Sequence, residues 1–182
     1  MRHIALLMLL LCVCQPAVAQ ENYQVIVSAG ATRGVSLTDT RARPASEFGI
    51  DFYPPILKKK IGLSYVYVYR HPQYGIAKPF AINRTEGMHF IGPIFRFTSE
   101  KRVQPWLSGG LMLYGDKISI SFFDELLLES KKRKATASAS AGINFFLAKG
   151  LLLQPHVRFA GIPRPLWQVG GRIGWQFGTR SK

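Results

Sequence analysis

The residues of this sequence that could support a covalent reaction are one histidine and two serines in its last third. His156 could act as a general base, provided that a serine hydroxyl lay within hydrogen-bonding distance to serve as the nucleophile. Ser138 and Ser140 could approach His156 from a neighbouring strand, but their spacing does not require it. His71 and His89 lack companions at metal-ligand spacing. The sequence therefore predicts no catalytic residue, no metal site and no cofactor.

A second set of polar residues is charged and is expected to share one side of the strands described below. An ionisable side chain that is removed from water must be paired, because an unpaired buried charge is strongly destabilising. We expect Glu47 and Asp51 each to meet one of Arg96, Arg158 or Arg172. The predicted interior charge network comprises Glu47, Asp51, Arg96, His156, Arg158 and Arg172.

The segments that must position these residues have the two-residue period of β-strands. In residues 166–177, large apolar residues alternate with Gln, Gly and Arg, and residues 135–147 and 151–160 repeat this alternation. Most segments have about the 9–11 residues with which a tilted strand crosses a bilayer. We expect strands at residues 23–33, 43–53, 61–70, 87–97, 103–114, 135–147, 151–160 and 166–177.

The composition of the two faces indicates which solvent surrounds the strands. One face is apolar, and the other is small and polar with a few charges, whereas the lysines gather mainly in the connections. A charge on a lipid-facing position costs roughly 2–4 kcal/mol at the middle of a bilayer, so its absence favours a membrane. Residues 87–97 and 103–114 are ambiguous, because both of their faces carry bulky apolar residues. A soluble barrel with its apolar face around a ligand remains an alternative.

The connections between the expected strands alternate in length. Residues 34–42, 71–86 and 115–134 are expected as long loops, and the intervening connections are short. Long loops at one end and tight turns at the other are typical of outer-membrane barrels. An even number of strands also returns both ends of the chain to the side of the short turns.

The long connection 115–134 is unusually apolar for a loop, and it ends in a basic run. It could be a strand extension or a short helix that folds over the rim. A further hypothesis is that its Leu and Phe residues touch the outer leaflet or a partner while the basic run binds lipopolysaccharide phosphate. The predicted contact residues are Lys131, Lys132, Arg133 and Lys134.

The beginning of the chain predicts export. Arg2, an apolar run over residues 4–13 and a small-residue site ending at Ala19 form a secretory signal at 1–19, which leaves one domain at 20–182. Both cysteines lie within that signal, so no disulfide is expected. The net charge of +14 favours a polyanionic partner. Lipid phosphate is more plausible than nucleic acid, because the protein is exported and contains no recognition motif.

Three stretches of the chain resemble the small eight-stranded outer-membrane barrels of the OmpA/OmpX type. They are VQPWLSGGLMLY at 103–114, ATASASAGINFF at 135–146 and VGGRIGWQF at 169–177. The last is similar to the terminal-strand signal that the outer-membrane assembly machinery reads, with its aromatic end at Phe177, although five residues follow it here. The resemblance implies architecture and membrane rather than activity.

GPIFRF at 92–97 and VQPWLSGG at 103–110 also look like parts of the outer-membrane enzymes that remove acyl chains from lipid A. That family carries a His-x-Ser-Asn motif with a serine nucleophile and a histidine base. The corresponding stretch here begins at His156, but the position of the nucleophile is Arg158. The match therefore lacks the group that would perform the reaction.

Together these observations predict an all-β protein, an eight-stranded antiparallel up-and-down transmembrane β-barrel. We expect a monomer in the outer membrane that has a structural or interaction role and a lumen filled by side chains. A narrow channel and a deacylase-like enzyme without a recognisable nucleophile are the alternatives.

Overall fold

The computed structural model describes residues 23–36, 39–77, 80–99, 101–122, 125–161 and 166–178. The expected signal at 1–19 lies outside these ranges. Eight antiparallel strands pair in sequence order and close into a barrel, because β8 pairs with β1. Among the described residues, no helix is long and apolar enough to cross a membrane. The predicted fold class is confirmed.

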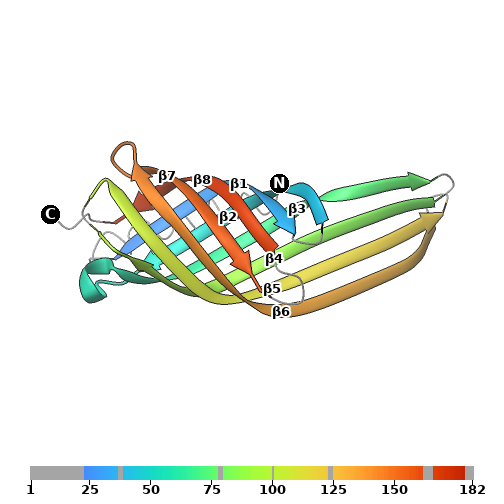
Figure 1. Cartoon of the computed structure of the whole chain (residues 1–182), viewed down its shortest axis with the longest axis horizontal. Coiled ribbons are helices and arrows are strands. Elements are labelled where there is room, and N and C mark those ends of the chain that lie inside the picture. Colours follow the sequence, from blue (N-terminus) through green and yellow to red (C-terminus); the bar gives the residue numbers. More distant parts are fainter. Residues whose placement is uncertain are drawn as a thin grey trace.

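The strands are joined so that three short connections lie at one end of the barrel, which we call the turn end (Figure 1). These connections are residues 54–60, 97–102 and 147–150, and the first contains the short 3-10 helix η1, Ile56–Lys59. The strands are β1 Gln24–Ser36, β2 Asp39–Tyr53, β3 Ile61–Ala77, β4 Phe80–Arg96, β5 Val103–Phe122, β6 Glu125–Phe146, β7 Leu151–Ala160 and β8 Leu166–Phe177.

Strands β3 to β6 continue well past the other four at the end opposite the turns (Figure 1). We call this four-stranded extension the overhang; it comprises residues 71–77, 80–86, 115–122 and 125–134. The expectation of long loops at 34–42, 71–86 and 115–134 is therefore wrong, because most of these residues lie in strands. For 115–134 the strand extension is the correct alternative. Its charged residues lie in paired strands, where Asp116 on β5 is opposite Lys132 on β6, so the charge of this segment does not indicate a loop.

The outward-facing surface of the barrel is apolar over a similar length of most strands. On β5 it runs from Val103 to Leu113, on β6 over residues 135–145 and on β8 from Trp167 to Phe177. The other outward stretches lie at residues 25–31, 48–52, 61–69, 89–97 and 151–159. We call this surface the apolar band; among the described residues, no Asp, Glu, Lys or Arg side chain faces outward within it.

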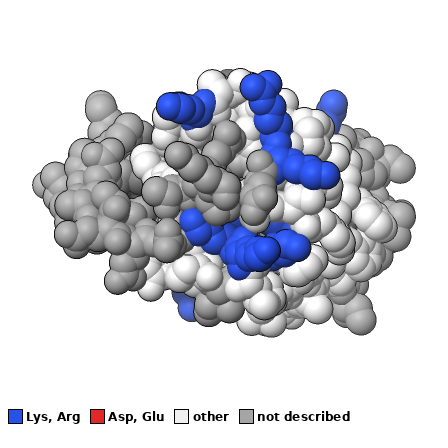
Figure 2. Space-filling model, turned by 90° about the vertical axis from the view of Figure 1, so that its left-hand side faces the viewer, with Lys and Arg blue, Asp and Glu red and all other residues white. Residues whose placement is uncertain are grey.

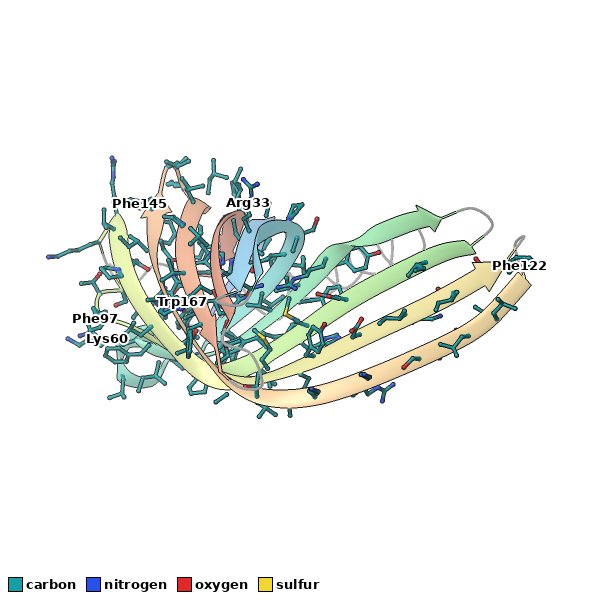
Figure 3. All side chains as sticks on the ribbon, turned by 45° about the vertical axis from the view of Figure 1, so that its right-hand side comes forward. Arg33, Lys60, Phe97, Phe122, Phe145 and Trp167 are labelled. Atoms are coloured by element: carbon teal, nitrogen blue, oxygen red, sulfur yellow. The ribbon has the colours of Figure 1, made fainter. Side chains whose placement is uncertain are left out.

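Charged residues begin where the apolar band ends. The next outward charges are Lys117 on β5, Arg133 on β6 and Arg33 on β1. At the turn end the band finishes near Phe97 and Phe145, next to Lys60, whereas Phe122 lies far away at the tip of the overhang (Figure 3). The overhang therefore starts at the border of the band.

The inside of the barrel contains two apolar clusters as well as polar side chains. The turn-end cluster comprises Ile26, Tyr53, Ile94, Trp106, Phe146 and Leu152. The mouth cluster, nearer the overhang, comprises Ala45, Val66, Val68, Met88, Phe90, Met112 and Ala160. Strands β4 and β5 thus carry large apolar residues on both faces, which explains why their sequences were ambiguous. The expectation of a mainly small and polar inner face is corrected accordingly.

Candidate functional site

A buried group of charges lies between the two apolar clusters. Along β7, Leu152 of the turn-end cluster is followed by the inward-facing Gln154, His156 and Arg158, and then by Ala160 of the mouth cluster. Each of these side chains is almost completely removed from water. The alternation of the strand therefore places polar residues in a layer that apolar side chains border on both sides.

Glu47 on β2 is the centre of this layer. Its Oε1 accepts a hydrogen bond of 2.8 Å from Nη1 of Arg158, and its Oε2 lies 2.9 Å from Nε2 of His156. Arg158 also donates to the amide oxygen of Gln168 at 3.3 Å and, through Nε, to the hydroxyl of Ser140 at 3.2 Å. The carboxylate thus bridges a guanidinium and an imidazole, which offsets the cost of burying the Glu47 and Arg158 charges.

Asp51 has a different environment from the one that the sequence predicted. Its Oδ1 accepts a hydrogen bond of 2.6 Å from the hydroxyl of Ser64, and no arginine among the described residues forms an ion pair with it. Arg172 instead extends over β2, where a Cβ atom built on Gly49 would lie 2.2 Å from its Nη1. Arg172 Nε and Nη1 have no hydrogen-bond partner among the described residues. The predicted pairing of Asp51 with an arginine is therefore wrong.

Arg96 lies deeper, toward the turn end, and bonds to neutral oxygens. It donates to the carbonyl of Lys59 from Nε and Nη2 at 3.2 and 2.6 Å, and to the amide oxygens of Gln104 and Gln24. Its guanidinium also stacks 3.5 Å above the centre of the Tyr53 ring. Arg96 thus joins the turn at 54–60 to the wall of the barrel through hydrogen bonds to neutral oxygens.

The arrangement around His156 does not form a serine–histidine pair. Its Nδ1 lies 3.3 Å from the carbonyl oxygen of Gln154, while Nε2 faces Glu47, so an oxygen lies opposite each nitrogen. The hydroxyl of Ser140 accepts a hydrogen bond from Arg158, and that of Ser138 donates to the carbonyl of Phe159. Within the described ranges, no three His, Cys, Asp or Glu residues are grouped in a way that could hold a metal ion.

The overhang carries a second group of charges. At its base, Arg70 on β3 donates to Glu86 on β4 at 2.7 Å. On its outer surface Glu129 accepts hydrogen bonds from Lys117 at 3.1 Å and from Lys131 at 2.7 Å. Both lysines lower the pKa of Glu129, so this carboxylate stays ionised at pH values at which an ordinary glutamate would already bind a proton. Sequence reasoning missed these three ion pairs because it placed Glu86 and Glu129 in loops.

The predicted lipopolysaccharide-contact residues lie together on β6 of the overhang. Lys131, Lys132, Arg133 and Lys134 are all exposed, and they pair with β5 between Tyr114 and Lys117. Strand β7 begins to pair with β6 only at Ser138, so no described strand pairs with this part of β6 on its other side. Charged side chains, lysine above all, are typical of exposed edges, where they oppose pairing with other chains.

The fold and its apolar outer surface define a class: the chain has the fold of the small eight-stranded outer-membrane β-barrels. A similar structure is that of Ail, the attachment invasion locus protein of Yersinia pestis, in complex with the heparin analogue sucrose octasulfate. It has 12% identity and a TM-score of 0.63, and the match covers 86% of this chain and 100% of that one.

Two further barrels give comparable matches. For Neisserial surface protein A the identity is 11% and the TM-score 0.61, with 86% of this chain and 98% of that chain covered. For the N-terminal barrel domain of Pseudomonas aeruginosa OprF the identity is 16% and the TM-score 0.59, with the same coverage. No protein-family model and no curated protein sequence matches the chain. These likenesses establish the fold.

Proposed function

We propose that this protein is a monomeric outer-membrane barrel with a structural and interactive role, which contacts lipopolysaccharide through its overhang. The observation that carries the proposal is the apolar band. On β5 and β6 it spans residues 103–113 and 135–145, about the length with which a tilted strand crosses a bilayer. Its border is marked by Lys117 and Arg133, where headgroups would begin. The three neighbours described above, which are small outer-membrane barrels, support the same location.

The cations of β6 support lipopolysaccharide as the partner. Lys131 to Lys134 are exposed at the base of the overhang, just beyond the apolar band. In a membrane this position would lie at the depth of the lipid phosphates. Each basic side chain near an anionic membrane surface contributes about 1 kcal/mol to binding. One neighbour, Ail, was solved with a sulfated heparin analogue, so a barrel of this fold can present a surface for a polyanion.

The test compares two variants that each lose four cations. The overhang variant is K131Q/K132Q/R133Q/K134Q, and the turn-end variant is K58Q/K101Q/R102Q/K149Q. Both are refolded in detergent and titrated with purified lipopolysaccharide at low and high salt. We expect the overhang variant to bind at least tenfold more weakly at low salt, with the difference shrinking at high salt, and the turn-end variant to lose clearly less affinity. Equal affinities of the overhang variant and the unmodified protein would refute the proposed contact.

We further propose that export uses the signal at 1–19 and that assembly uses the terminal strand. Phe177 lies at the outward-facing end of β8, and Trp175, Ile173 and Val169 precede it on the same face. This periodic apolar strand next to the chain end suits recognition by the assembly machinery. Replacing Phe177 with Ala should lower the amount of heat-modifiable barrel in outer-membrane fractions, whereas replacing the inward-facing Gln176 with Asn should not.

The contacts in the lumen favour a filled, non-catalytic barrel over both alternatives. Val68, Phe90 and Met112 of the mouth cluster are almost fully buried, and the Glu47 layer lies below them. We therefore propose that the refolded protein gives no stable ion conductance in planar bilayers and releases no fatty acid from lipopolysaccharide. Fatty-acid release that is lost on H156A would revive the enzymatic alternative, and discrete conductance steps would revive the channel.

A further inference from the structure

The described charged residues in the turns at the turn end of the barrel are all basic. Figure 2 looks onto this end and shows Lys and Arg side chains but no Asp or Glu among the described residues in view. The charged residues described in the three turns are Lys58, Lys59, Lys60, Lys101, Arg102 and Lys149. All three turns contribute, so the positive charge surrounds the end of the barrel instead of forming one cluster.

Most of these cations are directed into solvent. Lys58, Lys101, Arg102 and Lys149 are exposed, and Lys60 is partly exposed. Lys59 differs, because it is buried and its carbonyl receives the Arg96 guanidinium. Its burial and, to a smaller extent, the Arg96 charge lower the pKa of Lys59. We therefore count the four exposed side chains as the cationic surface.

Two exposed leucines lie among these cations. Leu57 immediately precedes Lys58 and is 61% exposed, while Leu147 lies two residues before Lys149 and is 64% exposed. Two of the three turns, 54–60 and 147–150, thus present a leucine close to a cation. In water, exposed leucines at both sites would be unfavourable, but at the border of a lipid leaflet the same pattern places leucine in hydrocarbon and lysine at the phosphates.

The backbone of the first turn has a strained conformation in which Leu57 and Lys58 are exposed. Leu57, Lys58 and Lys59 have φ values of 49°, 53° and 59°, in the left-handed region that residues with a Cβ atom rarely adopt. The hydrogen bonds from Arg96 to the carbonyl of Lys59 hold the turn against this strain. Backbone strain of this kind is concentrated at functional segments of proteins.

We propose that the turn end binds the headgroups of anionic phospholipids, with Leu57 and Leu147 in the adjacent hydrocarbon and Lys58, Lys101, Arg102 and Lys149 on the phosphates. The proposal rests on the membrane-spanning apolar band proposed above, whose last residues, Phe97 and Phe145, lie next to this surface (Figure 3). Phosphate of a lipid is favoured over an acidic polymer in solution because the cations of all three turns lie at the border of the band and two of these turns also expose a leucine.

The chain contains a spectroscopic reporter at this surface. Trp175 faces outward, is 48% exposed and lies against the turn at 147–150, where a Cβ atom built on Gly150 would be 2.7 Å from its ring. Trp167 also faces outward but lies at the other end of β8, and Trp106 is buried in the lumen. In a W167F background, quenching by lipids therefore reports on the turn end, because Trp106 is shielded from the bilayer.

The experiment measures lipid composition around Trp175 with brominated acyl chains, which quench tryptophan on contact. The W167F protein is refolded into vesicles of phosphatidylcholine containing a minority of phosphatidylglycerol, with bromine placed on one lipid or the other. We expect phosphatidylglycerol to be enriched around Trp175 at least about twofold over its bulk fraction. The enrichment should disappear in K58Q/K101Q/R102Q/K149Q and at high salt, and persist in the K131Q/K132Q/R133Q/K134Q control.

The possible failures are distinguishable. Quenching that follows the bulk composition, with strong quenching by brominated phosphatidylcholine, would overturn lipid selectivity but leave the barrel in the bilayer. Weak quenching by both brominated lipids would overturn the membrane-spanning band itself. Enrichment that persists in the turn-end variant would show that the four cations do not bind the headgroups.

Discussion

Glu47 on β2 and Arg158 on β7 form a 2.8 Å ion pair inside the barrel, although 111 residues separate them in the sequence. The two strands are not neighbours in the sheet, because β1 and β8 lie between them. The pair therefore connects separate parts of the wall through the lumen. Both side chains are almost completely buried, so neither charge can recover its hydration if the other is removed.

Replacing Arg158 with Met should destabilise the barrel strongly. Glu47 would keep only the His156 contact, and removing one partner of a buried pair costs about 3–5 kcal/mol. The matched control is R172M, which should cost less because two nitrogens of Arg172 have no hydrogen-bond partner among the described residues. Urea unfolding in the presence of vesicles measures both. The double variant E47Q/R158M should recover part of the free energy of unfolding that R158M loses. Equal losses for R158M and R172M would show that the Glu47–Arg158 pair has no special role.

Replacing Gly92 with Ala should disrupt the packing of β4 against β5. A Cβ atom at this position would lie 2.3 Å from the carbonyl oxygen of Gly109 and 2.7 Å from Cα of Gly110, so the two strands would have to separate. At Gly49 the obstructing atoms are instead side-chain atoms of Arg172 and Ser28, which can move. We expect G92A to lower the urea midpoint more than G49A. The opposite order would contradict the close approach of β4 and β5.

Replacing Glu129 with Gln should strengthen lipopolysaccharide binding at neutral pH by roughly two- to fivefold, because it removes the carboxylate that Lys117 and Lys131 share. The lowered pKa of Glu129 means that its ion pairs are present above the ordinary glutamate range and are lost only as pH falls through that lowered value. The ratio of the lipopolysaccharide affinities of E129Q and the unmodified protein should therefore stay constant from neutral pH down to the pH range in which an ordinary glutamate titrates. This ratio should approach one only at lower pH. Calorimetric titration of both proteins with lipopolysaccharide over this pH range measures it. A weaker E129Q would contradict the proposed contact.

The fold could be predicted because the two faces of several strands differ sharply in size and polarity. In β6 and β7, small or charged residues such as Ser138 and Arg158 alternate with larger apolar ones, so the inward side was evident. In β4 both Phe90, which faces inward, and Ile91, which faces outward, are large and apolar. Hydrophobicity alone could not show that half of these residues fill the lumen.

The partners of the buried charges could be predicted only in part. Burial required a basic partner for Glu47, and the structure supplies Arg158, but which arginine it meets depends on the stagger of the strands around the barrel. No single strand encodes that stagger. For Asp51 the adjacent strand offers Ser64 at the paired position, so a neutral donor replaced the expected arginine.

The most direct test of the account compares two arginine substitutions on outward-facing leucines. Leu111 lies within the apolar band on β5, and Leu127 lies near the tip of the overhang; both are about half exposed. The measured quantity is the free energy of unfolding from phospholipid vesicles. If the band is in hydrocarbon, L111R should lose about 2–4 kcal/mol and L127R almost nothing. Equal and small effects of both substitutions would show that Leu111 faces water, and the account of a membrane-spanning barrel would be wrong.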